Sequence, residues 1–254
     1  MKIKFEKLST VNGKVYVNFG NGFKEYQISE VKDSGITIPE DCTDYSLIQI
    51  KGSSVILNNL DVISSIKTSD DNAISPEDIT GIVLKDFNGI FDKSLLQKYP
   101  KLTSVTIPEG ATFIGGYAFQ GCSSLTSIAI SDSVTSIGGS AFQDCSSLTS
   151  IFIPDNVKSI SGGAFQNCSK LESITIPDSV TTIGDMAFAF CESLTSITIP
   201  DSVTSISGFA FVSCDSLMNI NYKGTKEQWN AIEKDEIWYR GCSSNMTINY
   251  NYAE

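Results

Sequence analysis

The chain has 254 residues, and 41% of them are hydrophobic, which is enough for a folded core and too many for a disordered protein. Its net charge of −11 and its single arginine, Arg240, argue against nucleic-acid binding, because neutralising phosphates takes clustered lysines and arginines. Histidine is absent, which excludes Ser-His and Cys-His catalytic pairs and every imidazole metal ligand.

Residues 1–77 show short alternating segments and no repeat. Apolar stretches at 1–5, 15–17, 36–38, 46–51, 55–57 and 62–66 are separated by turn sequences, which predicts a small all-β domain. The polar segment 69–75 suits a linker, and an attachment module is one interpretation of this domain. The first residues contain no apolar segment of the signal-peptide kind, and no run of 18 apolar residues predicts membrane insertion.

A 23-residue repeat organises residues 78–222. Five units align without a gap from Lys101, as in SLTSITIPDSVTSISGFAFVSCD from Ser193; a divergent unit precedes them at 78–100, and part of a seventh follows. The Leu and two Ile of each unit share one face of an extended segment, and they are buried only when coils stack. The pattern predicts a mainly β fold with short helices, a right-handed leucine-rich-repeat solenoid of 23-residue coils preceded by the small all-β domain.

Each aligned unit also repeats an Ala-Phe pair and a cysteine. The phenylalanines predict an internal aromatic stack. The cysteines are interpreted as buried, reduced thiols, because parallel side chains on a ladder do not converge as a disulfide or a zinc site requires. The two series are Phe119, Phe142, Phe165, Phe188 and Phe211, and Cys122, Cys145, Cys168, Cys191 and Cys214.

Residues 223–254 predict a C-terminal cap. Thr225–Gln228 reads as a capping box, so a helix carrying Trp229 and Ile232 on one face is expected to begin at Thr225. The units SLTSITIPDSVTSIG…AFxxC and the GTKEQW segment resemble the BspA-type leucine-rich repeat family. This resemblance covers 78–222 and the tail, but not 1–77. It implies a surface or secreted protein of bacteria, some protists or mobile elements that binds host or matrix proteins or other cells.

Acidic residues also recur every 23 positions. Stacked carboxylates about 5 Å apart could hold Ca²⁺, but one carboxylate per coil is a thin ligand set. The favoured interpretation is that each acid accepts backbone N–H bonds in a turn, so no metal site and no cofactor are predicted. The series is Asp86, Glu109, Asp132, Asp155, Asp178 and Asp201.

The outward position of the first strand varies between coils, so packing does not fix it. It is occupied by Val83, Thr106, Ala129, Phe152, Thr175 and Thr198. The predicted partner-binding residues are Phe152, Thr106, Thr175 and Thr198, together with Tyr117 from a second variable set that includes Met186 and Phe209. The alternative for Phe152 is a lone surface aromatic without a function.

The predicted function is non-catalytic recognition or adhesion, in which the solenoid surface binds a protein or glycan partner. One alternative is a component of a virion or other assembly, with residues 1–77 as anchor and the repeats as receptor-binding tip. A second is an enzyme that uses a carboxylate pair. The resemblance implies a cell-surface or secreted location, whereas the assembly alternative implies a virion or the cytoplasm. The sequence predicts neither the ligand nor the oligomeric state.

Overall fold

The computed structural model describes residues 100–107 and 109–253 with their side chains. Before them it describes the backbone of eight strands: β1 (Lys2–Ile3), β2 (Lys14–Asn18), β3 (Phe23–Gln27), β4 (Ile36–Thr37), β5 (Ser46–Lys51), β6 (Ser54–Leu57), β7 (Gly81–Leu84) and β8 (Ile90–Phe91). The strand predicted at 62–66 lies outside these residues.

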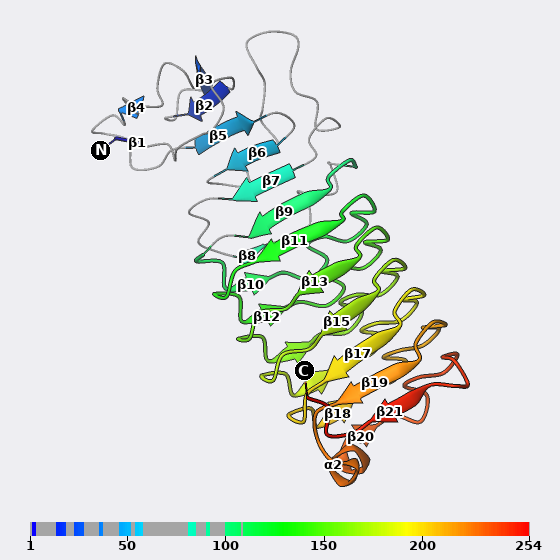
Figure 1. The fold of residues 1–254 in the computed structure, drawn as a ribbon. Coiled ribbons are helices and arrows are strands. Elements are labelled where there is room, and N and C mark those ends of the chain that lie inside the picture. The colour runs from blue at the N-terminus through cyan, green and yellow to red at the C-terminus, as the bar shows by residue number, and fades with distance from the viewer. Residues whose placement is uncertain are drawn as a thin grey trace.

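The repeat folds as a stack of coils, and each coil adds one strand to each of two sides (Figure 1). Equivalent residues of neighbouring coils pair in parallel, as Ile151 does with Ile174, so the register equals the 23-residue period. The predicted β-solenoid is therefore confirmed. The longer strands are β9 (Ser104–Ile107), β11 (Ser127–Ile130), β13 (Ser150–Phe152), β15 (Ser173–Thr175), β17 (Ser196–Ile199), β19 (Asn219–Tyr222) and β21 (Thr247–Asn249). On the other side β8 is followed by β10 (Phe113–Ile114), β12 (Ser136–Ile137), β14 (Ser159–Ile160), β16 (Thr182–Ile183), β18 (Ser205–Ile206) and β20 (Glu233–Lys234).

The longer strands belong to two sheets. One runs β13-β15-β17-β19-β21, and the other runs β11-β9-β7-β6-β5-β2-β3. The second sheet contains strands from both sides of residue 77. Strand β6 pairs in parallel with β7, whereas β2 pairs antiparallel with β3 and β5, and β5 pairs antiparallel with β6. The separate pair β1 and β4 is also antiparallel. The division into domains at residue 77 stays a prediction, but strands from both sides of it share one sheet.

The core is a set of columns that run along the solenoid. The phenylalanines at positions 119, 142, 165, 188 and 211 are fully buried and stack with centroids 5.1–5.4 Å apart and interplanar angles of 4–11°. This confirms the predicted aromatic stack. Each ring stacks on the ring of the next coil, so a coil is stable only as part of the stack.

Two turn positions in each coil have left-handed backbone. One precedes the Ala-Phe pair and the other precedes the cysteine. Glycine, asparagine and aspartate adopt this conformation most readily, whereas bulky residues are unfavourable there. The first series is Tyr117, Ser140, Gly163, Met186 and Phe209, and the second is Gly121, Asp144, Asn167, Phe190 and Ser213, with φ between 54° and 76°.

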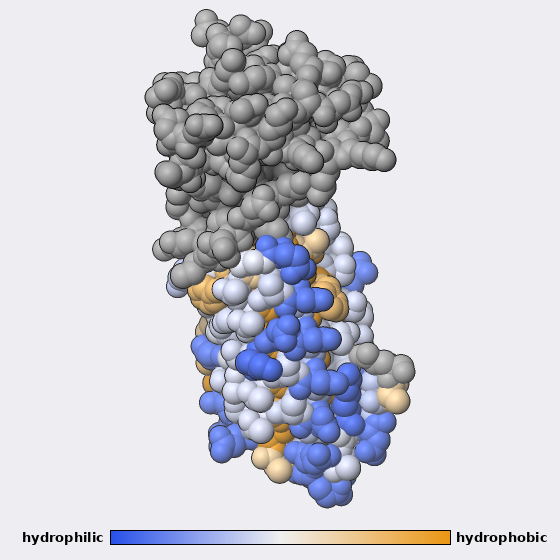
Figure 2. Space-filling view, turned by 90° about the vertical axis from the view of Figure 1, so that its left-hand side faces the viewer, coloured by the Kyte–Doolittle hydropathy of each residue, from blue (hydrophilic) through white to orange (hydrophobic). Residues whose placement is uncertain are grey.

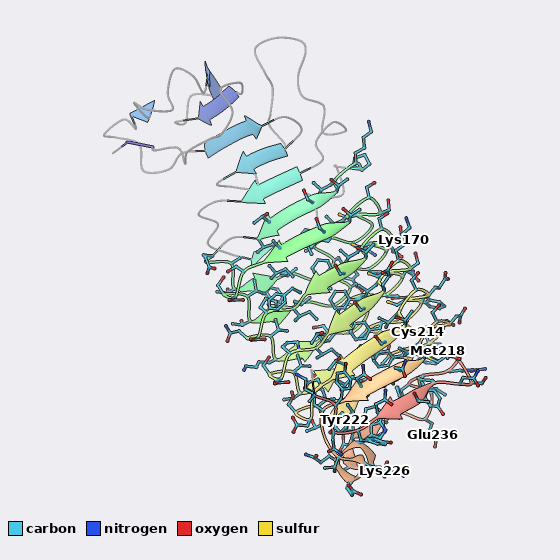
Figure 3. The ribbon with its side chains drawn as sticks, in the orientation of Figure 1. Lys170, Cys214, Met218, Tyr222, Lys226 and Glu236 are labelled. Atoms are coloured by element: carbon cyan, nitrogen blue, oxygen red, sulfur yellow. The ribbon has the colours of Figure 1, made fainter. Side chains whose placement is uncertain are left out.

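A short helix lies at the C-terminal end of the solenoid (Figure 3). Helix α2 (Lys226–Ala231) begins after Thr225, whose Oγ1 accepts from Gln228 N at 3.2 Å while Thr225 N donates to Gln228 Oε1 at 2.8 Å. The predicted capping box is confirmed. Lys234 pairs with Ile206 and so continues a column of buried isoleucines. Its ammonium donates to two backbone carbonyls and lies 5.0 Å from the centre of the Trp229 ring.

Candidate recognition surface

Phe152 stands out on the face formed by the longer strands. Its side chain is 62% exposed, whereas the residues that flank it in the alignment of coils, Ala129 and Thr175, are short. Phe152 pairs with Thr175, which pairs with Thr198, and Thr106 pairs with Ala129 in the neighbouring sheet. The predicted residues of this column therefore follow one another on one side of the solenoid, and the boundary between the two sheets falls beside Phe152.

Thr198 differs from the rest of this column. Only 8% of its surface is exposed, whereas Thr175 is exposed and Thr106 is half-buried. In the register Thr198 lies between Thr175 and Asn221. Although it was predicted as a contact residue, it offers a partner little area, so the exposed part of this face centres on Phe152.

A surface depression of about 310 Å³ lies beside Phe152. Phe152 and Thr175 line it together with Ser150, Ser173, Asp155 and Pro177, which belong to the same two coils. Three isoleucines of these coils complete the lining, so the depression combines an apolar floor and one exposed aromatic ring with hydroxyl groups and one carboxylate. An exposed aromatic beside a hollow is the arrangement that anchors binding partners in many interfaces.

Tyr117 lies in a different part of the coil. It precedes the Ala-Phe pair in the turn between β10 and β11, where its φ is 62° and its side chain is 42% exposed. It does not line the depression beside Phe152. Tyr117 therefore does not belong to the column of outward strand residues that contains Phe152.

The laddered cysteines are buried free thiols, as predicted. From Cys145 to Cys214 the thiol of each coil donates to the phenylalanine carbonyl of the coil before it, as Cys145 Sγ does to Phe119 O and Cys168 Sγ to Phe142 O, both at 3.2 Å. Burial raises the pKa of the Cys122 and Cys191 thiols to about 12. The cysteines therefore join coils by hydrogen bonds. Cys42 lies outside the described residues.

Alkylation tests this assignment. At pH 8 a thiol with a pKa of about 12 is ionised in roughly one molecule in ten thousand, so iodoacetamide is expected to leave the five laddered cysteines unmodified in the native protein. Cys242 is half-buried, and its hydrogen bond with the Cys214 side chain lowers its pKa, so it is expected to react first among the described cysteines. Mass spectrometry of the adducts checks this, with a urea-denatured sample as control. Rapid native labelling of Cys145 or Cys168 would contradict it.

The acidic column lies in the turns that follow the longer strands. Figure 2 shows the side of the solenoid that carries these turns, and hydrophilic surface runs along it. The described members of the column are all exposed, and Asp178 forms an ion pair of 3.0 Å with Lys223. Within residues 100–107 and 109–253, no three acidic or cysteine side chains converge in a way that could hold a metal ion. Asp86 lies outside the described residues.

Serines, and not the acids, join these turns. Ser133 Oγ donates to Ala111 O at 2.7 Å, Ser202 Oγ donates to Val180 O at 2.6 Å, and Ser179 makes the equivalent bond to Val157 O. Among the described residues no backbone N–H of these turns donates to a carboxylate of the column. The predicted backbone N–H bonds to these acids are therefore not seen in the described turns, where the residue after the acid reaches the previous coil: a serine after Asp132, Asp178 and Asp201, and Asn156 after Asp155.

Stacked coils with two parallel ladders and a repeated Leu and Ile core define a leucine-rich-repeat solenoid. The family model described as the BspA type leucine rich repeat region matches residues 23–148 and 112–231, with six copies. The chain therefore belongs to the BspA-type leucine-rich repeat family, as its repeat predicted. A comparison with curated proteins found no match.

Solved structures of bacterial leucine-rich repeat proteins share the fold. A leucine rich cell surface protein of Faecalibacterium prausnitzii A2-165 is 29% identical with a TM-score of 0.52, over 63% of this chain and 56% of that one. A leucine rich repeat protein of T. pallidum is 27% identical with a TM-score of 0.52, over 69% of this chain and 76% of its own. The chain thus spans little more than half of the Faecalibacterium structure.

The described part of the chain contains no helix long and apolar enough to cross a membrane. Its one helix, α2, has six residues.

Proposed function

We propose that this protein is a non-catalytic recognition or adhesion protein whose solenoid binds a protein or glycan partner, with Phe152 as the central contact. The observation that carries the proposal is the 62% exposure of Phe152 beside an open depression. The rest of its column consists of a valine, an alanine and threonines, so the solenoid itself does not require a large aromatic group there. Aromatic residues in such positions often supply most of the binding energy of an interface.

The chemistry of the surface supports binding and not catalysis. The chain has no histidine, and the raised cysteine pKa values belong to thiols that are buried between coils. The depression beside Phe152 contains a single carboxylate, Asp155, and no lysine or arginine. A carboxylate-dependent mechanism would need a second acid close by. Binding at this face is expected to depend only weakly on salt.

Family membership and the structural relatives support a location on a bacterial cell surface. The Faecalibacterium structure is a cell surface protein, and the fold presents a long, regular side to solvent. Repeat scaffolds bind through residues that vary between coils, which is the property that distinguishes the column of Phe152. We therefore propose adhesion as the role of the solenoid.

Phe152→Ala tests the proposal. This variant is expected to lose at least about 1 kcal/mol of binding free energy, about fivefold in Kd, while its melting temperature stays unchanged. Immobilised matrix proteins and a glycan array, probed with wild type and variant, identify the partner and measure the loss. Tyr117→Ala is the matched control, because it removes an exposed aromatic from another turn. If Tyr117→Ala abolishes binding and Phe152→Ala has no effect, the strand face is not the recognition surface.

A further inference from the structure

The coil of residues 170–192 departs from the three coils before it at one turn. In those coils the two residues before the cysteine are Gln and then Gly, Asp or Asn, and the residue after it is Ser. In this coil the same three positions are Ala189, Phe190 and Glu192. Phe190 is 39% exposed, and Ala189 is fully buried. The change therefore places an aromatic ring and a carboxylate together on the surface of a single coil.

The backbone conformation does not favour Phe190. Its φ is 60°, and the equivalent residues of the preceding coils, Gly121, Asp144 and Asn167, are of the types that adopt left-handed backbone most readily. The turn itself is held by backbone bonds such as Phe190 N to Val212 O at 2.8 Å, which any residue can make. The turn thus does not require a bulky aromatic at this position, although Tyr117, Met186 and Phe209 show that the solenoid tolerates large residues in left-handed backbone at its other turn.

Phe190 and Glu192 close one end of a groove. The groove has a volume of about 530 Å³ and is lined by two residues from each of four consecutive coils: Gly121 and Ser123, Asp144 and Ser146, Asn167 and Ser169, and Phe190 and Glu192. At 4.7–4.9 Å per coil it is about 14 Å long. It runs along the turns that enter the longer strands, on the side where Lys170 is labelled in Figure 3. It shares no lining residue with the depression beside Phe152.

Two of the groove's polar side chains, Asp144 and Glu192, are carboxylates, and the others are three serines and Asn167. Asn167 Nδ2 donates to Asp144 Oδ1 at 2.7 Å, which holds that carboxylate in place and leaves its second oxygen for a ligand. Neither Asp144 nor Glu192 has an ion-pair partner among the described residues, where the one ion pair joins Asp178 and Lys223. Residues 101–222 carry ten carboxylates and three lysines, of which only Lys170 adjoins the groove in the sequence.

We propose that this groove binds an extended basic segment of a partner protein, with a lysine or arginine of that segment held between Phe190 and Glu192. An aromatic face and a carboxylate both attract a cation, and arginine can stack on a ring while it pairs with an acid. About four extended residues span 14 Å at 3.3 Å each, so a second basic side chain can reach Asp144. Neutral glycans gain nothing from the negative field of this surface, and acidic glycans are repelled by it.

The test variant replaces both unusual residues with those of the preceding coil. Phe190→Asn and Glu192→Ser give this coil the residues that the preceding coil has at the same positions, Asn167 and Ser169, so the double variant is expected to fold and to melt no lower than wild type. A random 12-residue peptide library displayed on phage is selected on the wild-type chain. The selected peptides are expected to be rich in lysine and arginine, and to bind the double variant at least tenfold more weakly. Their affinity is expected to fall when salt is raised from about 50 to 500 mM.

Two control variants keep the inference separate from the proposed function. Asp201→Asn removes an exposed acid from another turn, and Phe152→Ala removes the anchor of the strand face, and neither is expected to change peptide binding. If no peptide is selected, if the selected peptides are not basic, or if they bind the double variant equally well, the proposal is wrong. A glycan that binds wild type and loses affinity for the double variant would assign the groove to sugars and would also overturn it.

Discussion

Replacing Phe165 by alanine is expected to lower the free energy of unfolding by about 3–5 kcal/mol. Phe165 is fully buried in the middle of the stack, with its ring centroid 5.4 Å from those of both Phe142 and Phe188. The substitution removes both ring contacts and leaves a cavity that the neighbouring coils cannot close, because their backbones are fixed by hydrogen bonds such as Phe165 N to Ala187 O at 2.8 Å. A domain is stable by about 5–15 kcal/mol, so the loss is a large part of the total.

Urea unfolding measures this loss, with Phe152→Ala as the matched control. Both variants remove the same atoms, but Phe152 is 62% exposed and its truncation is expected to change stability by less than about 1 kcal/mol. Similar losses for the two variants, or a loss below about 1 kcal/mol for Phe165→Ala, would contradict the assignment of these residues to core and surface.

The sequence predicted the solenoid because its period has a direct structural meaning. A strand places alternate residues on one face, so Ile128 and Ile130 must both be buried, and a constant spacing of 23 puts the next coil in register. The phenylalanine stack and the buried cysteines follow from the same reasoning. The sequence did not predict that the thiols bond to phenylalanine carbonyls, because Cys145 and Phe119 are 26 residues apart and their contact depends on the offset between coils.

Features that depend on backbone dihedral angles could not be predicted in this way. The left-handed conformation of Phe190 is invisible in the sequence, since phenylalanine gives no turn signal. The groove could not be predicted either, because its lining residues come from four stacked coils. The low exposure of Thr198 was missed for a related reason, because exposure depends on neighbours in other coils and not on the alternation within one strand.

The 23-residue spacing between paired strands does not extend before residue 78. Ser54 of β6 pairs with Gly81 of β7, and these residues are 27 positions apart, whereas the aligned coils pair at 23. Counting back by 23 therefore could not place β6 beside the solenoid. The family model, which matches from residue 23, also extends into this region. The sequence predicted strands here because alternation is local, but not their place in the sheet.

Trp238→Ala is expected to lower the free energy of unfolding of the C-terminal end by about 3–5 kcal/mol. The Trp238 ring lies edge-on to Phe211, with centroids 5.8 Å apart and an interplanar angle of 84°, and it also contacts Trp229 at 5.9 Å. It is only 6% exposed and covers the last ring of the stack, which would otherwise meet solvent. A solenoid without a cap exposes the apolar side of its final coil.

The location of the effect distinguishes this variant from Phe165→Ala. Coils contact only their neighbours, so losing the cap is expected to open the chain from its C-terminal end while the central coils stay closed. Hydrogen exchange should therefore speed up in β19 and β21, whose amides are joined by pairs such as Ile220 with Ile248, and remain slow in β13 and β15. Trp238→Phe keeps a ring over Phe211 and is expected to lose much less protection. Uniformly faster exchange in all coils after Trp238→Ala would show that the solenoid unfolds as one unit and that Trp238 is not a local cap.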